Sequence, residues 1–141
     1  MTTSKAPYIV IDTNVLISAG ILPQSRLAKI LVIVAGEFVI AQNEATWNEM
    51  LSRIERAKFD RYFGESGRLT YLSMLARLVQ FFGVVSDVRI SRDPDDDKFV
   101  SLALDAGAKI IISGDADLKD IKIHKGIEIM SPSTFLARFA R

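Results

Sequence analysis

Short, uninterrupted runs of apolar residues alternate along this chain with longer segments whose apolar residues recur every three or four positions. The runs at 8–11 and 109–113 show no alternation of polar and apolar residues, which is typical of strands buried on both faces. Further short strands are predicted at 37–41, 84–85 and 127–130. Strands that alternate with helices form a parallel sheet covered on both sides, so the pattern predicts an α/β fold.

The intervening segments have the spacing and the end signals of helices. We predict helices over 15–36 with a break near Pro23, over 43–57, over 66–82, from the acidic turn at 93–97 to Gly107, and from Ser131-Pro132 onwards. Asn43 is suited to the N-cap of its helix, and proline after Ser131 is typical of a first helical position. Apolar residues from Leu69 to Val79 share one face, which extends the 66–82 helix to Phe82.

The composition narrows the class of protein. A chain of 141 residues with 49% hydrophobic and 25% charged residues is expected to form a single domain over 1–141. It has no cysteine, which excludes disulfides, zinc fingers, iron–sulfur clusters and thiol catalysis. The single histidine, His124, excludes sites built from several histidines, and we expect it in a solvated turn. The net charge of +1 neither indicates nor excludes nucleic-acid binding, because local fields matter more.

No segment has the length and hydropathy of a membrane span, because the longest apolar stretch, 27–36, is interrupted by Lys29. The N-terminus lacks the basic-then-apolar layout of a signal peptide. We therefore expect a soluble, cytoplasmic protein. The mean hydropathy of +0.22 is high for such a protein and favours an apolar surface that a partner buries.

Four acidic residues are predicted to meet at one edge of the sheet. Asp12 and Asp115 each follow a strand, and Asp97 begins the helix that leads into the second of these strands. Glu49 lies on a helix that can point at the same edge. Carboxylates gathered at one site stay ionised together only around a cation, and oxygen ligands without His or Cys select Mg²⁺ or Mn²⁺. Each acid alone also fits a helix cap or a solvated turn, so the prediction rests on their joint placement.

Four sequence segments together resemble the PIN-domain ribonucleases. They are IVIDTNVL at 9–16, TWNEML at 46–51, DPDDDKF at 93–99 and SGDADL at 113–118. The resemblance extends over nearly the whole chain, from Tyr8 to the last predicted helix. The segment at 54–63 is similar to the bacterial subgroup described as toxin components of toxin–antitoxin pairs, akin to the VapC-type toxins.

The resemblance implies a three-layer α/β/α fold with a five-stranded parallel sheet in the order 3-2-1-4-5. It also implies a Mg²⁺- or Mn²⁺-dependent ribonuclease, a cognate antitoxin that blocks the site, and a homodimer. Matched residue by residue, the acids of the family are Asp12, Glu49, Asp97 and Asp115. Asp12 and Asp97 would be the main metal ligands, and the other two would complete the site directly or through water.

Several further positions match polar positions that line such sites. Asn14 and Ser113 are two of them, and Asp117 is a second candidate beside Asp115. The acidic turn offers three consecutive aspartates at 95–97. Asp97 is chosen because it directly precedes the Lys-Phe start of the helix.

The mechanism implied is the in-line attack of a metal-activated water on an RNA phosphodiester, which leaves 5′-phosphate and 3′-hydroxyl ends. The basic residues of the middle helices are candidates to hold the RNA backbone: Arg53, Arg56, Lys58, Arg61, Arg68 and Arg77. A phosphotransferase of the haloacid-dehalogenase type is disfavoured, because it needs a second aspartate where this chain has Asn14. The alternative from another class is a non-catalytic PIN-like module that binds RNA or protein, in which the acids are caps that need no metal.

Overall fold

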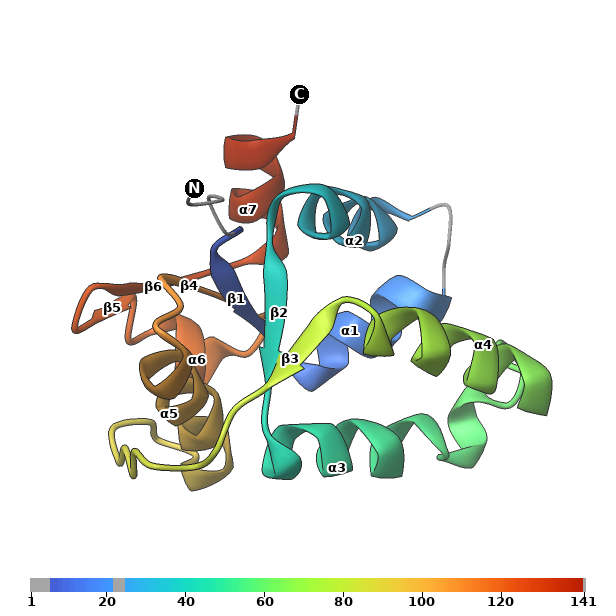
Figure 1. Cartoon of the computed structure of the whole chain (residues 1–141), viewed down its shortest axis with the longest axis horizontal. Helices are drawn as coiled ribbons and strands as arrows, with labels where there is room; N and C mark the ends of the chain where they lie inside the picture. The colour runs from blue at the N-terminus through green and yellow to red at the C-terminus, as the bar shows by residue number, and fades with distance from the viewer. Residues whose placement is uncertain (1–5, 22–24, 141) are drawn as a thin grey trace, which may run out of the picture.

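The centre of the computed structural model, which describes residues 6–21 and 25–140, is a six-stranded sheet (Figure 1). In this described part the strand order is β3-β2-β1-β4-β6-β5, and every neighbouring pair is parallel except β6 and β5. The first five strands therefore confirm the predicted 3-2-1-4-5 arrangement, and β5 adds an antiparallel edge. The strands are β1 (Tyr8–Ile11), β2 (Val39–Gln42), β3 (Val79–Phe81), β4 (Ile110–Ile112), β5 (Ile123–His124) and β6 (Ile127–Met130).

Helices cover both faces of this sheet, which confirms the three layers. Their bounds are α1 (Thr13–Ile21), α2 (Arg26–Glu37), α3 (Glu44–Ile54), α4 (Glu65–Ala76), α5 (Asp97–Ala106), α6 (Ala116–Lys119) and α7 (Pro132–Phe139), with short 3₁₀ turns η1 (Ala57–Phe59) and η2 (Pro94–Asp96). In β1, Ile9 and Ile11 pack with residues of α1 to α4 and α7, whereas Val10 packs with α5. The uninterrupted apolar run of β1 thus serves two cores. The predicted break near Pro23 lies outside the described residues.

The third strand is not where the sequence analysis places it. The chain leaves α4 before Val79–Phe81, which pairs with β2 as β3. Val84 and Val85 lie instead in an irregular segment and are 64% and 87% exposed. The helical spacing that starts at Leu69 was misleading, because Leu69 is itself 62% exposed. The open edge of β2 satisfies the backbone groups of β3, and this tertiary pairing overrides the local helical pattern.

A hairpin at the other edge of the sheet was missed. His124 belongs to β5 and is half-buried, rather than lying in a solvated turn. The two residues between β5 and β6, Lys125 and Gly126, have positive φ angles of 48° and 81°. Positive φ at both central residues is the geometry of a type I′ turn, which suits a two-residue hairpin. A strand of two residues is too short to leave a periodic signal.

Several helix ends are fixed by local chemistry, as predicted. The Asn43 side chain accepts a hydrogen bond from the backbone of Thr46, whose hydroxyl accepts one from the backbone of Asn43. Ser131 caps α7 before Pro132, and Gly107 ends α5 at a φ of 71°. The Asn43 cap matters most for the site, because it begins α3 directly after β2 at the sheet edge.

Among the described residues, no single helix is long and apolar enough to cross a membrane. The pair α1 and α2 passes that test only when taken together, and the two helices lie at 108° to each other.

Candidate active site

A small cavity of about 110 Å³ opens where the carboxyl ends of β1 and β4 meet α3 and the acidic turn before α5. We call it the carboxylate cavity, and its lining residues are Asp12, Thr13, Asn14, Glu49, Arg53, Asp93, Asp95, Asp96, Lys98, Phe99 and Asp115. The carboxyl edge of a parallel sheet is where α/β proteins bind ligands. Of the four predicted acids, the structure brings three to this cavity, namely Asp12, Glu49 and Asp115.

Asp12 is buried at the end of β1 and is held on both oxygens. Its Oδ1 accepts a hydrogen bond from the backbone N–H of Val15 at 2.8 Å, and its Oδ2 accepts one from the hydroxyl of Ser113 at 2.5 Å. The same Ser113 oxygen accepts from the backbone N–H of Asp115 at 2.9 Å, so one hydroxyl positions two acidic segments. Burial raises the pKa of Asp12 in spite of these hydrogen bonds, because the charged form loses its solvation.

Glu49 reaches the cavity from the middle of α3 and meets two cations. Its Oε2 lies 2.5 Å from Lys98 Nζ and 3.3 Å from Arg53 Nη2, and its Oε1 accepts from the Thr13 hydroxyl at 2.5 Å. Arg53 also donates to Asn14 Oδ1 at 3.1 Å. Burial alone would raise the pKa of Glu49, but the hydrogen bonds and positive charges around it outweigh burial and lower the pKa. Glu49 is therefore held ionised.

Asp96, in the turn just before α5, is the acid with an unsatisfied oxygen. Its Oδ2 is buried and has no hydrogen-bond partner in the described part of the chain. Burial raises the pKa of Asp96 to about 7, and the negative charges of Asp115, Asp93 and Asp117 add to the rise. A buried oxygen without a donor is costly, and a cation beside it would remove both the desolvation and the repulsion.

Asp97, chosen from the sequence as a metal ligand, does not line the carboxylate cavity. Its Oδ1 accepts hydrogen bonds from the backbone N–H groups of Ile90 at 3.1 Å and Ser91 at 2.7 Å. Its buried side chain lines a neighbouring cavity instead. Successive residues of a helix point about 100° apart, so two adjacent aspartates at a helix start face different surroundings. The structure thus brings Asp96, rather than Asp97, to the other acids.

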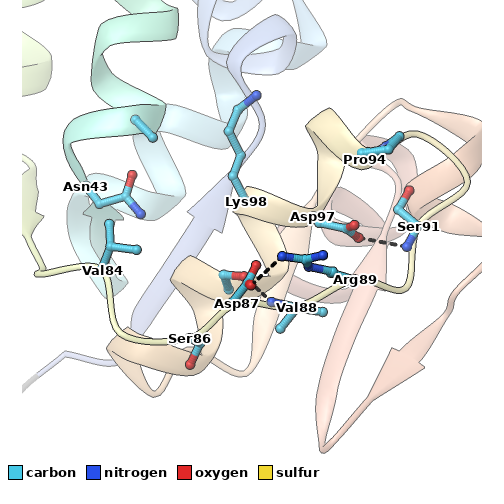
Figure 2. Close-up of a pocket in the computed structure, with 12 residues that line it drawn as sticks. Asn43, Val84, Ser86, Asp87, Val88, Arg89, Ser91, Pro94, Asp97 and Lys98 are labelled. Carbon is cyan, nitrogen blue, oxygen red and sulfur yellow. Dashed lines mark hydrogen bonds and ion pairs between the residues drawn. The ribbon is translucent and has the colours of Figure 1, made fainter.

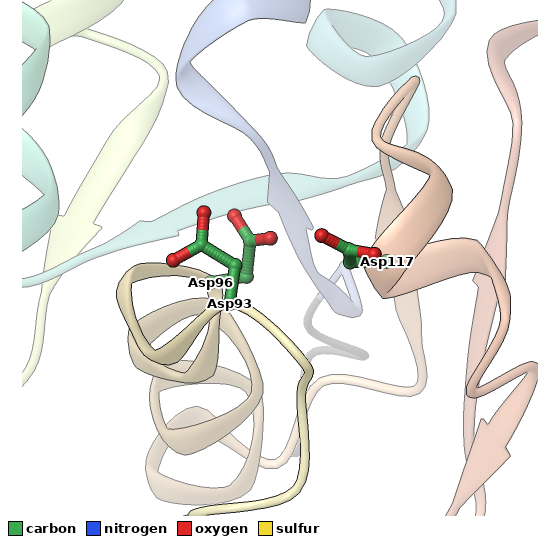
Figure 3. A group of neighbouring side chains, drawn as sticks. All are labelled: Asp93, Asp96 and Asp117. Atoms are coloured by element: carbon green, nitrogen blue, oxygen red, sulfur yellow. The ribbon is translucent and has the colours of Figure 1, made fainter.

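Asp115 is the N-cap of the short helix α6, and Asp117 lies in the first turn of that helix. Asp115 Oδ1 caps that helix by accepting from the backbone N–H of Asp117 at 2.8 Å. One oxygen each of Asp93, Asp96 and Asp117 lies within 4.8 Å of the other two, and Figure 3 shows the three carboxylates around one space. Arg92 pairs with Asp117 at 3.3 Å. Asp117 therefore belongs to an acidic group that shares Asp96 with the carboxylate cavity.

The donor set of this site fits a hard divalent cation. The candidate ligand atoms are carboxylate oxygens, which Mg²⁺ and Mn²⁺ prefer over nitrogen or sulfur. The unpartnered oxygen of Asp96 lies in a cavity that Asp12 and Asp115 also line. A cation beside Asp96 would offset the loss of solvation and the repulsion from Asp115, which together raise the pKa of Asp96.

The sequence pattern of the PIN domain family matches residues 8–117, a span that includes every acid of the carboxylate cavity. The chain belongs to the PIN domain family. This membership confirms the resemblance seen in the four sequence segments. An uncharacterised protein of Methanocaldococcus jannaschii is 30% identical to this PIN domain over 143 residues, which cover 94% of this chain and 92% of that protein.

The fold of this PIN domain is similar to that of several solved structures. A chain of VapBC2 from Rickettsia felis, solved with a fragment of promoter DNA, matches with a TM-score of 0.61 at 12% identity, over 88% of this chain and 98% of that one. VapC20 of Mycobacterium tuberculosis, described as a toxin that cleaves the sarcin-ricin loop, matches with a TM-score of 0.56 at 15% identity, over 85% and 98%. A protein of Pyrobaculum aerophilum matches with a TM-score of 0.58 at 15% identity, over 96% and 98%. At these identities the likeness is one of fold.

Two basic residues of the carboxylate cavity, Arg53 and Lys98, form ion pairs with Glu49 that were not predicted. Arg53 lies four residues after Glu49, and this helical spacing is a sequence signal for an ion pair. Lys98 comes from α5, and no local pattern predicts its contact with α3. Arg68, a predicted RNA contact, donates to the carbonyl of Ile54 at 2.8 Å and so ties α4 to the end of α3.

Proposed function

We propose that this PIN domain is a ribonuclease that hydrolyses RNA phosphodiester bonds with Mg²⁺ or Mn²⁺. The observation that carries the proposal is the buried, unpartnered Oδ2 of Asp96, in a cavity that it shares with Asp12 and Asp115. Clustered carboxylates at the carboxyl edge of a parallel sheet fit divalent-metal chemistry on phosphate esters. Membership of the PIN domain family, a family of nucleases, supports the same reaction class.

We assign Asp12, Asp96 and Asp115 as the ligands of the ion, with Glu49 completing the site. When bound, the ion activates a water for attack and neutralises charge on the phosphoryl group. Ser113 positions Asp12 and the backbone of Asp115 through its single hydroxyl. Asp97 is not assigned as a ligand of the ion, because it holds the segment that contains Ile90 and Ser91.

Lys98 and Arg53 are proposed to bind the RNA phosphates. Both line the cavity, and both pair with Glu49. An ammonium and a guanidinium beside a bound ion would hold the non-bridging oxygens of a phosphodiester and orient it for in-line attack. Asn14, which accepts from Arg53 at 3.1 Å, helps to fix that guanidinium.

The test is cleavage of a labelled single-stranded RNA with Mn²⁺, with Mg²⁺ and with EDTA, beside the Asp12→Asn variant. We expect metal-dependent cutting with 5′-phosphate ends, which Asp12→Asn loses. No cutting of any RNA together with measurable Mn²⁺ binding would contradict the ribonuclease but keep a metal site. No cutting and no metal binding would favour the non-catalytic module, in which Asp12 and Asp115 serve as helix caps.

We further propose that the protein is the toxin of a toxin–antitoxin pair. The fold likeness to the toxin VapC20 and to the VapBC2 complex supports this role. A cognate antitoxin would cover the carboxylate cavity, and the predicted homodimer would be its binding unit. Induced expression in bacteria should arrest growth, and the Asp12→Asn variant should not. Sedimentation equilibrium of the purified protein tests the dimer.

A further inference from the structure

A second, larger cavity of about 530 Å³ borders the carboxylate cavity. It lies between the start of α3, the helix α5 and the irregular segment 84–91 (Figure 2). Lys98 lines both cavities, and its Nζ lies 2.5 Å from Glu49. An RNA strand with a phosphate at the carboxylates and Lys98 would therefore place a neighbouring nucleotide at the second cavity.

The outer wall of the second cavity is fixed although it has no regular secondary structure. Asp97, Ser101 and Asp105 lie one turn apart on one face of α5. Each accepts hydrogen bonds from backbone N–H groups of segment 84–91, at distances between 2.7 and 3.1 Å. The cavity is thus formed in advance, and a ligand would not have to order this wall.

The lining combines apolar walls with a free hydrogen-bond donor. Val84, Val88 and Ala45 contribute apolar surface. The oxygen of the Asn43 amide is engaged by the backbone of Thr46, whereas its nitrogen donates to no residue in the described parts of the chain.

The charges of the lining largely cancel away from Lys98. Asp87 and Arg89 pair with each other at 3.0 Å, and Asp97 is occupied by two backbone N–H groups. A free phosphate or another anion is therefore not the ligand that this cavity favours. The cavity suits a flat and largely neutral ligand that has apolar faces and a polar edge.

We propose that the second cavity takes one unpaired nucleobase of the RNA, next to the cleaved phosphate, and sets a base preference at that position. The inference rests on the proposed ribonuclease function. A nucleobase has two apolar faces for Val84 and Val88 and an edge that accepts from the Asn43 amide. The volume is in the range of sites that bind small organic ligands. Lys98 holds the phosphate that connects the two cavities.

The test compares two variants. Val84→Trp fills the cavity, whereas Val85→Trp changes the following residue of the segment, which does not line the cavity. Both positions are exposed, so both variants should fold, which thermal melting checks. Each protein is incubated with an RNA library that has a randomised central segment, once with Mn²⁺ and once with Mg²⁺. Sequencing of the cut ends then gives the relative kcat/KM for each base at each position beside the cut.

We expect the wild type to prefer one or two bases at a position next to the cut. Val84→Trp should reduce the ratio between favoured and disfavoured bases by about tenfold, while Val85→Trp keeps it. Asn43→Ser keeps a helix cap but removes the amide donor, and it should weaken the same preference.

Two results would overturn the base cavity and leave the ribonuclease intact. One is a wild type that cuts RNA without any base preference beside the cut. The other is a Val84→Trp variant that cuts with the wild-type preference. If the wild type cuts no member of the library with either metal, the proposed function fails, and the base cavity fails with it.

Discussion

Two consecutive aspartates at the start of α5 belong to two different regions of this molecule. Asp96 lines the carboxylate cavity with an oxygen that no described residue satisfies. Asp97 lines the neighbouring cavity and accepts two backbone hydrogen bonds from segment 84–91. The same kind of side chain, one position apart, is therefore a proposed metal ligand in one region and the acceptor that holds segment 84–91 in the other. Residue type and motif do not distinguish the two roles, whereas their hydrogen-bond partners do.

The two regions differ in what their carboxylates do to stability. On the face of α5 that carries Asp97, Ser101 and Asp105, which we call the anchoring face, the partners are backbone N–H groups that these side chains satisfy. In the carboxylate cavity, burial raises the pKa of Asp96 to about 7, and the negative charges of neighbouring acids add to the rise. We therefore expect the anchoring face to contribute to folding and the cavity to cost stability until a cation binds.

The largest expected difference is in activity. Asp96→Asn removes a proposed ligand and should lower kcat/KM for RNA by more than about a hundredfold, since even residues that only support ligands cost 10- to 100-fold. Asp97→Asn keeps an oxygen that can accept from the loop and should lower kcat/KM only a few-fold. Initial rates on a single labelled RNA measure both. A larger loss for Asp97→Asn than for Asp96→Asn would reverse the assignment.

The next difference is in the free energy of unfolding. Asp97→Ala leaves the backbone N–H groups of Ile90 and Ser91 without an acceptor and should destabilise the protein by about 2–3 kcal/mol. Asp96→Ala should destabilise the metal-free protein much less, because the charges of Asp115, Asp93 and Asp117 repel the ionised form of the lost carboxylate. Urea unfolding in EDTA measures both variants. Equal losses for the two would show that Asp96 has a structural role as well.

A third prediction concerns metal binding. Mn²⁺ at a hundred times its dissociation constant should stabilise the wild type by about 2.7 kcal/mol, because it binds only the folded protein. The melting temperature of Asp97→Asn should rise by a similar amount, and that of Asp96→Asn should rise much less. Thermal melts with Mn²⁺ and with EDTA give these differences. An unchanged response in Asp96→Asn would remove this residue from the ligand set.

The smallest expected effect is on the pH dependence of stability without metal. The pKa of Asp96 is raised from 3.8 to about 7, so between these values the folded protein holds a proton that the unfolded chain releases. This contribution to stability is present below pH 4 and is lost as the pH rises towards 7. Solvent screening of this partly exposed group limits it to about 1 kcal/mol.

The control for the pH effect is Asp96→Asn in the same buffers with EDTA. The stability of the variant relative to the wild type should increase as the pH rises from 4 to 8 and then level off. A constant difference between the two proteins across this range would mean that Asp96 titrates normally.

Local patterns were sufficient for most of the fold. The apolar run of β1, the Asn43 cap and the Gly107 helix end depend on residues that are neighbours in sequence, and the structure confirms all three. The third strand was misplaced because the apolar residues before Val79 have helical spacing. Only pairing with β2 decides that Val79 belongs to a strand.

For the site, the sequence was sufficient to place Asp12 and Asp115 at one edge. Strands that are parallel end at the same side, so residues that follow β1 and β4 must lie close together. The contact of Lys98 with Glu49 joins positions 49 residues apart on different helices, and no periodic pattern encodes it. The ion pair of Arg53 with Glu49 could have been predicted, since a spacing of four residues on a helix is a local signal.

The sequence by itself determined an α/β sheet with acids at its carboxyl edge, because strands that alternate with helices form a parallel sheet whose carboxyl ends lie at one edge. Only the tertiary structure shows that Asp96, and not Asp97, lines the carboxylate cavity. Which of two adjacent side chains faces a cavity depends on how segment 84–91 packs against α5, and that packing is set by hydrogen bonds between parts of the chain that no local pattern relates. The same packing creates the second cavity beside the carboxylates.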